Sequence, residues 1–351
     1  MTFDDARARA RAILGEAAHD GGRVGVVYHA DADGISAAAL ACATVERRGG
    51  AVIALTPPKG KNVYDDAFRA ELERVEARAV LVLDTGSRAG ARYGPLPTIV
   101  VDHHVAEAPP DVAAFVHDVR AISTSLLALD LLAPLARLDD RAWLAAIGAL
   151  GDRGDDARSE PAVGDAVVRF GRTSLDRVVA LVNAAGRAAD PRPDVALEAL
   201  RRADDPRTIV RGDSSAARRL HEMRAEVAEA SRRARRAPPR IRGRWAVIEI
   251  DEACRVHGIV ASSWARRLAP RIVLVANTGY MPGRVHVSVR SSEDIDLRAA
   301  MRALLPAEGD DYAAGHTRAT GAILTVAAYA RLIGAIDAEG ARAREAGQRA
   351  P

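Results

Sequence analysis

The sequence predicts an α/β protein of two domains, and three observations support this prediction. Short apolar runs rich in Val and Leu alternate with helical segments in the N-terminal part, a pattern typical of a parallel sheet covered on both faces. The chain has 351 residues, which is more than one hydrophobic core usually serves. A second alternation of strands and helices begins at Trp245, shortly after the Pro238-Pro239 pair, and such a pair is typical of a domain boundary.

The first domain is predicted over residues 1–205. Thr2–Ala18 has the pattern of a capped amphipathic helix. Strands are expected at 24–28, 51–55, 79–83 and 98–101, with helices at 35–48 and 65–77. Residues 123–150 are predicted to be helical in two segments separated near Pro134, with Ser123-Thr124-Ser125 as the cap, and 161–205 to form further helices.

The rest of the chain is predicted to hold a helical, Arg-rich linker, a smaller α/β domain and a flexible tail. The linker spans 206–240, the C-terminal domain 241–338 and the tail 339–351. Within the C-terminal domain, strands are expected at 245–250, 271–276 and 284–290. Helices are expected at 257–268, at 296–304 and from about Thr320 to Ile336.

Composition excludes several classes of protein. Charged residues of both signs make up 28% of the chain and the net charge is only +3, so nucleic-acid binding would have to come from local patches. The two cysteines, Cys42 and Cys254, are far apart in sequence and indicate neither a disulfide framework nor a thiolate metal site. The polar N-terminus and the absence of a long apolar run favour a cytoplasmic protein that does not contact membranes.

Acidic residues and histidines follow the predicted strands at the points where these strands end. One such residue alone is often a helix cap or a surface group, but here several predicted strands share the pattern. Because the carboxyl ends of parallel strands lie on one edge of a sheet, we expect these groups to converge. They are His29, Asp31 and Asp33 after the first strand, Asp84 after the third, His103 after the fourth, and Asp152 at the end of a later helix.

These six residues offer carboxylate and imidazole ligands and no thiolate. Such a set suits two manganese or magnesium ions better than a structural zinc ion. Two ions about 3.5–4 Å apart, bridged by one carboxylate, would activate a water molecule and stabilise charge on a phosphoryl group. The sequence therefore predicts a dinuclear metal centre.

The motifs that carry these residues resemble the DHH phosphoesterase superfamily. His29-Ala30-Asp31-Ala32-Asp33-Gly34, Asp84-Thr85-Gly86, Asp102-His103-His104 and Gly151-Asp152 are similar to its four ordered motifs, and the compact first motif resembles the RecJ-like branch. Arg290-Ser291-Ser292 and Ala314-Gly315-His316 resemble the C-terminal glycine-rich DHH-associated domain, with Ala314 where the family usually has glycine. The resemblance covers roughly residues 20–335.

The resemblance implies a role for each motif residue. His29, Asp31 and Asp84 would hold one ion, while Asp33, Asp84, His103 and Asp152 would hold the other, so that Asp84 bridges the two. His104 would face the substrate phosphate as a donor or general acid. The residues expected to act directly in catalysis are therefore His104, Asp84 and Asp33.

Five further residues are expected to bind substrate. Gly315 and His316 are predicted to lie in a loop before a helix beginning near Thr320, where backbone amides would cradle a phosphate. Arg290 would clamp the same phosphate, although by itself it also fits an ordinary surface arginine. Lys59 and Lys61 follow the second strand and would either contact phosphate or form a solvated turn. The run from Arg232 to Arg236 fits a groove for a phosphate backbone or a solvated helix equally well.

The resemblance implies a metal-dependent phosphodiester hydrolase, most simply a RecJ-like exonuclease acting on single-stranded DNA, RNA or short oligonucleotides. Aromatic residues are scarce, at 4% of the chain, so few are available for base stacking. A small-molecule phosphoesterase acting on nanoRNA, nucleotide bisphosphates or cyclic dinucleotides therefore stays an alternative. A non-catalytic nucleic-acid-binding scaffold is a further alternative, and a homodimer is compatible with the sequence.

Overall fold

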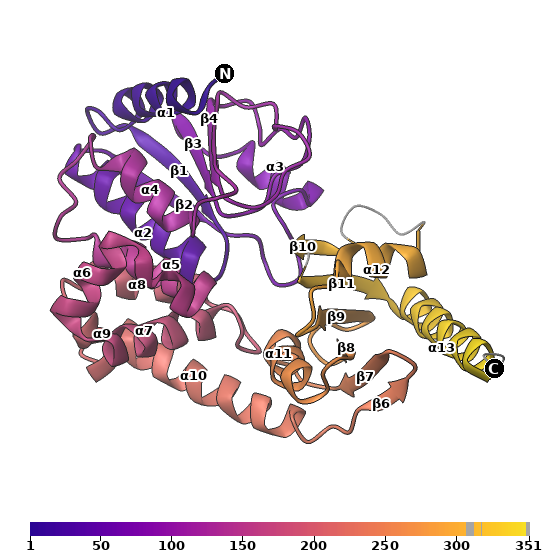
Figure 1. Cartoon of the computed structure of the whole chain (residues 1–351). Coiled ribbons are helices and arrows are strands. Elements are labelled where there is room, and N and C mark those ends of the chain that lie inside the picture. Colours follow the sequence, from indigo (N-terminus) through magenta and orange to yellow (C-terminus); the bar gives the residue numbers. More distant parts are fainter. Residues whose placement is uncertain (307–311, 317, 349–351) are drawn as a thin grey trace. The chain divides into compact units, whose positions relative to one another are not determined.

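Two compact units make up the computed structural model, which describes residues 1–306, 312–316 and 318–348. The first unit comprises Met1–Gly186 and Pro191–Arg224, and the second comprises Arg187–Asp190 and the chain from Ala225 onward. Each unit has its own sheet (Figure 1). The predicted fold class, a parallel-sheet domain and a smaller α/β domain, is confirmed.

The sheet of the first unit has five parallel strands in the order β2-β1-β3-β4-β5. Four of them match the predicted strands, and β5 was not predicted because only four residues form it at the sheet edge. The strands are β1 (Arg23–Tyr28), β2 (Ala51–Leu55), β3 (Ala79–Leu83), β4 (Thr98–Asp102) and β5 (Ala114–His117).

The chain order reverses at β1, which lies between β2 and β3. Ligands of open α/β sheets bind at such a switch point, outside the carboxyl ends of the strands. The residues that follow β1 and β3 therefore flank the place where this fold class binds ligands.

Helices cover both faces of this sheet (Figure 1). On one face α3 packs through Phe68 and Leu72 against Val27, Val80 and Val82. Helices α1, α2 and α4 lie on the other side (Figure 1). Their bounds are α1 (Phe3–Ala17), α2 (Ala32–Arg47), α3 (Asp66–Leu72) and α4 (Thr124–Leu132). Helix α2 begins at Ala32 rather than at the predicted residue 35 because Asp31 is its N-cap.

The remainder of the first unit is helical, and α10 crosses the division between the units after Arg224. Helix α5 packs against α2, α4 and α7, and so joins the sheet to this helical part. The helices are α5 (Trp143–Arg153), α6 (Pro161–Phe170), α7 (Arg172–Ala185), α8 (Pro193–Arg202), α9 (Pro206–Arg211) and α10 (Ser215–Ala234), with a 3₁₀ turn at Gly154–Ser159. In the part of the chain that the structure describes, no helix is long and apolar enough to cross a membrane.

The second unit contains a mixed sheet in the order β10-β11-β9-β8-β7-β6, in which only β7 and β8 pair in parallel. Valines of β9 face a core formed with α12 and α13. The elements are β6 (Arg240–Arg242), β7 (Trp245–Ile250), α11 (His257–Arg267), β8 (Ile272–Asn277), β9 (Arg284–Arg290), α12 (Leu297–Leu304), β10 (Ala314–His316), β11 (Ala319–Thr325) and α13 (Val326–Gln348).

The predicted helix starting near Thr320 is wrong in its first part. Residues Ala319–Thr325 form β11, which pairs along its whole length with β9, and α13 begins only at Val326. In β11 Ala322 and Leu324 face the core while Ile323 is exposed, which is the alternation of a strand. Helix α13 then continues through residue 339 to Gln348.

Candidate metal centre

The first motif leaves β1 at Tyr28 and turns directly into α2. The Asp31 carboxylate caps α2 by accepting hydrogen bonds from the backbone N–H groups of Asp33 and Gly34, at 3.2 and 3.1 Å. Its other oxygen lies 2.9 Å from Nδ1 of His29. Asp33 is in the first turn of α2 and is buried. The cap therefore holds three predicted ligands at the sheet edge.

Gly34 closes this motif for a steric reason. A Cβ atom at this position would lie 2.4 Å from the carbonyl oxygen of His29 and 2.8 Å from its backbone nitrogen. No real Cβ atom tolerates such distances to backbone atoms. A glycine is therefore required for α2 to start this close to the end of β1.

The Asp84 carboxylate lies between two groups of predicted ligands. Its Oδ2 atom is 3.7 Å from Nδ1 of His29, and its Oδ1 atom is 3.7 Å from Nε2 of His103 and 3.8 Å from Nδ1 of His104. The two oxygens thus face different imidazoles, which is the arrangement that a bridging carboxylate requires. The backbone of Asp84 has φ +62°, a left-handed conformation that Asp and Asn adopt more readily than other side chains.

Nε2 of His103 faces three carboxylates at nearly equal distances. The oxygens of Asp33, Asp84 and Asp152 lie 3.9, 3.7 and 3.8 Å away, which is too far for hydrogen bonds. Two ligand atoms that bind the same divalent ion, each at about 2.1 Å from it, lie roughly 3–4 Å from one another. The spacing therefore fits ligands around a cation, and the chemistry of these donors fits a divalent ion.

Asp102, the first residue of the Asp-His-His motif, orients the second histidine. Its Oδ1 atom accepts hydrogen bonds from the backbone N–H groups of His103 and His104, and lies 2.8 Å from Nδ1 of His104. Asp102 is fully buried. This contact fixes the ring of His104 and directs Nε2 away from Asp102.

The electrostatics of the cluster also favour a cation. Burial raises the pKa of Asp84 well above its usual range, and the charges of Asp33 and Asp31 raise it further. Burial likewise raises the pKa of Asp33. Carboxylates held together away from water need a compensating positive charge. Among the residues that the structure describes, two groups of side chains are close enough to share an ion, namely His29 with Asp31 and Asp84, and Asp84 with His103 and His104.

The stability of the metal-free protein should fall as pH rises from 6.5 to 9. Burial lowers the pKa of His104, but the Asp102 hydrogen bond and charge outweigh burial and raise this pKa to about 9. A raised folded-state pKa contributes stability that is complete below the unfolded value of about 6.5 and is lost as pH approaches 9. Urea denaturation midpoints measured with a chelator at both pH values would check this.

His104→Gln supplies the control for that measurement, since it removes the titrating ring. The difference in midpoint between wild type and variant should be larger at pH 6.5 than at pH 9. A difference that is the same at both pH values would contradict the assigned shift.

Asn183 supports the predicted ligands and was not identified from the sequence. Its side-chain oxygen accepts the backbone N–H of Ala32 at the start of α2. Gly151 of the fourth motif lets α5 approach Ala32, because a Cβ atom at position 151 would lie 2.6 Å from the Cβ of Ala32. The predicted cap of α4 is confirmed, with Ser123 as N-cap. The only sequence signal for a further role of this segment is the run of three hydroxyl residues.

Lys59 and Lys61 lie in the turn between β2 and α3, at the carboxyl edge of the sheet. Lys61 forms an ion pair of 2.6 Å with Asp65, the N-cap residue of α3. This contact corresponds to the solvated-turn interpretation of Lys61. A role for either lysine in substrate binding stays a prediction.

Arg290 belongs to the second unit, at the end of β9. Alternate residues of this strand, His286, Ser288 and Arg290, lie opposite the valines that face the core. Nη1 of Arg290 donates to the carbonyl oxygens of Val289 and Thr320, at 2.9 and 3.3 Å. The end of the guanidinium is thereby fixed by backbone groups rather than by an acid.

Basic residues gather on this face of the second unit, and we call four of them, Arg255, His257, His286 and Arg290, the basic cluster. The rings of His257 and His286 lie 5.7 Å apart. Burial lowers the pKa of His257 well below its usual range, and the charges of Arg255 and His286 lower it further. Within the described residues neither Arg255 nor Arg290 forms an ion pair with a carboxylate. Such a cluster suits an anion, and its members other than Arg290 were missed because they are scattered in sequence.

Gly315 and His316 lie in β10, which corrects the prediction of a phosphate-binding loop before a helix. His316 pairs with Ala319 of β11, and Ala319 pairs with Arg290 of β9. The sheet therefore brings the backbone of β10 to the strand end that carries Arg290. Any contact of Gly315 with a phosphate would therefore come from backbone groups of a strand.

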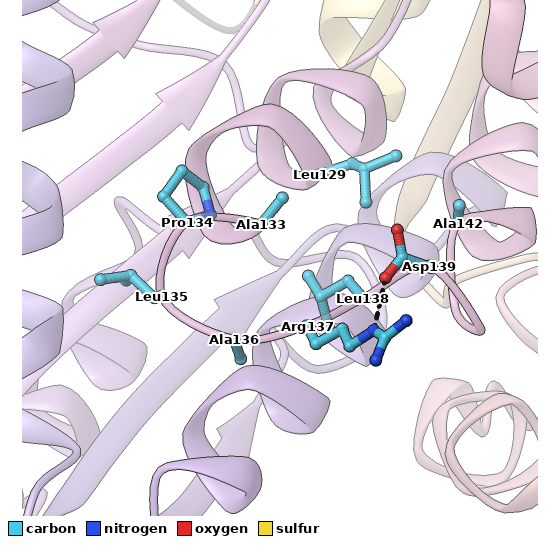
Figure 2. A pocket seen from close by; sticks show the side chains of 9 residues that line it. All are labelled: Leu129, Ala133, Pro134, Leu135, Ala136, Arg137, Leu138, Asp139 and Ala142. Atoms are coloured by element: carbon cyan, nitrogen blue, oxygen red, sulfur yellow. Dashed lines mark hydrogen bonds and ion pairs between the residues drawn. The ribbon is translucent and has the colours of Figure 1, made fainter.

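A cavity of about 550 Å³ lies apart from these residues, beside the end of α4. Figure 2 shows Arg137 and Asp139 paired with each other beside it. Most of its lining is aliphatic, formed by Leu129, Ala133, Pro134, Leu135, Ala136, Arg137, Leu138, Asp139 and Ala142. It contains none of the predicted site residues.

Comparison with solved structures identifies the fold. RecJ from Thermus thermophilus in complex with Mn²⁺ matches with a TM-score of 0.73 and 22% identity, over 96% of this chain and 55% of that chain. The chain has the RecJ fold. It spans only 55% of the length of that Thermus thermophilus chain. A second structure, of a RecJ exonuclease bound to manganese, matches with a TM-score of 0.68 and 22% identity, over 96% of this chain and 94% of that chain.

A further match is the DHH domain of a protein described as a member of a family of ribosomal proteins, with a TM-score of 0.65 and 16% identity over 96% of this chain and 90% of that chain. No protein-family model and no curated protein matches the sequence. The resemblance to DHH proteins drawn from the motifs is thus confirmed at the level of the fold.

Proposed function

We propose that this chain is a metal-dependent phosphodiester hydrolase that acts on single-stranded nucleic acid or short oligonucleotides. The observation that carries the proposal is the position of His103, whose Nε2 atom faces three carboxylate oxygens at 3.7–3.9 Å. An imidazole among three carboxylates at this spacing is a set of metal ligands. The manganese bound in two solved RecJ structures of the same fold supports the same interpretation.

Two divalent ions would be held at the switch point of the parallel sheet. His29, Asp31 and Asp84 would hold one of them. Asp33, His103 and Asp152 would hold the other, with Asp84 shared between the two. When bound, such ions lower the pKa of a water molecule and offset the charge of a phosphoryl group. Manganese fits this donor set, and magnesium is the alternative.

His104 would act on the phosphoryl group from the protein side. In the metal-free chain, the hydrogen bond and the charge of Asp102 raise the pKa of His104 to about 9 against the effect of burial. Asp102 occupies Nδ1, so Nε2 is the atom that would donate a hydrogen bond or a proton to a phosphoryl oxygen. Asp102 thus fixes the direction of this donor.

The basic cluster of the second unit would bind a phosphate of the substrate. Arg290 is preorganised by two backbone carbonyl groups, and a guanidinium matches the geometry of a phosphate. Gly315 and His316 lie on β10, which is separated from β9 by β11 in the same sheet. Lys59 and Lys61 would add contacts in the first unit.

A second candidate, hydrolysis of short or small phosphoesters only, is favoured by the burial of the aromatic residues. Of the four Phe, three Trp and six Tyr residues, all within the described ranges, only Phe3 is exposed; Tyr64, Phe115, Trp264 and Tyr329 are half-buried and the others are buried. Proteins that bind long single strands stack bases on accessible aromatic rings. Short oligonucleotides, nucleotide bisphosphates and cyclic dinucleotides therefore belong in the test.

Hydrolysis of end-labelled substrates with Mn²⁺ tests the proposal. The panel comprises a long single strand, a dinucleotide, a cyclic dinucleotide and adenosine bisphosphate, each with wild type and Asp84→Asn. Stepwise release of mononucleotides from the long strand would support the exonuclease, whereas turnover of small substrates alone would support the second candidate. No turnover by either protein would overturn the hydrolase and favour a nucleic-acid-binding scaffold. Equal turnover by both proteins would show that hydrolysis does not depend on the proposed metal centre.

Replacement of Arg290 by Ala should raise KM about 10- to 100-fold, because loss of one hydrogen bond to a charged group typically weakens binding by about this factor. We expect kcat to change less. The reason is that the guanidinium would bind substrate without touching the reacting atoms. Steady-state kinetics would check this, with Arg284→Ala as the matched control, since Arg284 begins the same strand and is exposed. An unchanged KM in Arg290→Ala would remove Arg290 from the substrate site.

A further inference from the structure

Helix α4 contacts two of the ligand carboxylates with its first two residues. The backbone N–H groups of Thr124 and Ser125 donate to the two oxygens of Asp33, at 2.7 and 2.9 Å. The Thr124 hydroxyl donates to Oδ1 of Asp84 at 2.8 Å. All four side chains are buried. One residue, Thr124, therefore connects the carboxylates that follow β1 and β3.

The capping of α4 explains why these amides point at Asp33. The first N–H groups of a helix have no acceptor within the helix and carry a partial positive charge. The N-cap Ser123 accepts the N–H of Leu126 at 3.2 Å, so its hydroxyl does not satisfy the amides of Thr124 and Ser125. Asp33 satisfies both, and thereby each of its oxygens has one lone pair already engaged.

The position of α4 is itself fixed by α5. The hydroxyl of Ser125 donates to the carbonyl oxygen of Ala145 at 3.1 Å and lies 2.9 Å from the hydroxyl of Ser123. A Cβ atom on Gly148 of α5 would lie 2.1 Å from Oγ of Ser125 and 2.6 Å from Oδ1 of Asp33. The start of α4, the carboxylate of Asp33 and α5 are therefore packed without spare volume.

The Thr124 hydroxyl acts on the oxygen of Asp84 that faces His103. Oδ1 of Asp84 accepts this hydrogen bond and lies 3.7 Å from Nε2 of His103, whereas Oδ2 faces His29. A β-branched side chain has few rotamers, so the donor is held in place. Loss of the hydroxyl would let the carboxylate rotate and move Oδ1 away from the side of His103.

We propose that Thr124 is a positioning residue that fixes Asp84 as the bridge between the two ions. This inference rests on the proposed metal centre and adds to it a residue outside the four motifs. Removal of the hydroxyl weakens the ion on the side of His103 more than the ion on the side of His29. Groups that orient metal ligands typically contribute about 10- to 100-fold to metal affinity.

The test is titration of the chelator-treated full chain with Mn²⁺, followed by calorimetry and by electron paramagnetic resonance. Thr124→Val keeps the shape of the side chain and removes the hydroxyl, whereas Thr124→Ser keeps the hydroxyl. We expect wild type and Thr124→Ser to bind two ions with an exchange-coupled spectrum. We expect Thr124→Val to bind the second ion about 10- to 100-fold more weakly and to lose the coupled spectrum.

Two comparisons keep the result interpretable. Thr173→Val, on the surface of α7, should bind Mn²⁺ like wild type. If Thr124→Val does not fold, as judged by circular dichroism, the Mn²⁺ affinities of Thr124→Ala and Thr124→Ser are compared instead. Both variants lack the methyl group of Thr124, and only Thr124→Ser keeps the hydroxyl.

The outcomes separate this inference from the proposed function. Wild type that binds no Mn²⁺ would remove the metal centre itself. If wild type binds two coupled ions, and Thr124→Val or Thr124→Ala shows the same Mn²⁺ affinity and the same spectrum, the role of Thr124 would be overturned. The proposed function would then still stand.

Discussion

Asp84→Asn should reduce phosphodiester hydrolysis by at least about 1,000-fold, since loss of groups that merely orient metal ligands already costs about 10- to 100-fold. Asp84 is the carboxylate whose two oxygens face different histidines, so its replacement affects both proposed ions. The amide has the size of the carboxylate but lacks its charge. Turnover of the best substrate of the panel, measured at saturating Mn²⁺, would give the ratio.

Asn is a better replacement than Ala at this position because of the backbone. Asp84 has φ +62°, which Asn tolerates and Ala does not, so Asp84→Ala would combine lost ligation with backbone strain. Asp139→Asn is the matched control, because Asp139 is an exposed residue beside Arg137 in the loop after α4. Activity of Asp84→Asn within about tenfold of wild type would exclude Asp84 as the bridging ligand, since even an orienting group contributes that much.

Gly34→Ala should impair both folding and metal binding. The added methyl group would lie 2.4 Å from the carbonyl oxygen of His29, and a backbone atom cannot move aside without shifting the end of β1. Overpacking of this kind typically costs about 1–3 kcal/mol, against a gain of up to about 1 kcal/mol from the helix propensity of Ala. Because His29 is a proposed ligand, Mn²⁺ affinity should fall together with the denaturation midpoint.

Gly164→Ala is the control for this substitution. Gly164 also lies within a helix, α6, but a Cβ there has no heavy atom within 4 Å, so only the propensity gain remains. Urea denaturation and Mn²⁺ titration of both variants would test the pair. Equal stability of Gly34→Ala and Gly164→Ala would show that the start of α2 can shift, and that the glycine of the first motif is not required sterically.

Local sequence determined most of the first unit. Every residue of β3 and β4 is buried, and so is every residue of β1 except the first. A strand covered on both faces is recognisable from composition alone. Since parallel strands share one carboxyl edge, the residues after them could be predicted to meet. His29, Asp31, Asp33, Asp84 and His103 do meet, and Asp152 joins them from the end of α5.

Weak local signals failed where tertiary pairing decided the structure. Residues 319–325 contain Ala, Gly and Thr among a few larger apolar residues, which fits a helix or a strand. They became β11 because β9 supplies an antiparallel partner along the full length, and strand formation of this kind depends on packing against a neighbouring strand rather than on local preference. The same reason moved Gly315 and His316 from a predicted loop into a strand.

The sequence by itself determined which residues are proposed as ligands and on which edge of the sheet they lie. Only the tertiary structure decided how those ligands are held. Thr124 and Asn183 come from helices outside the motifs, Gly148 lies one turn before the fourth motif, and each acts through contacts that no local pattern encodes. The physical reason is that strand ends are ordered by the sheet, whereas the hydrogen bonds that orient buried carboxylates depend on which helices pack across them.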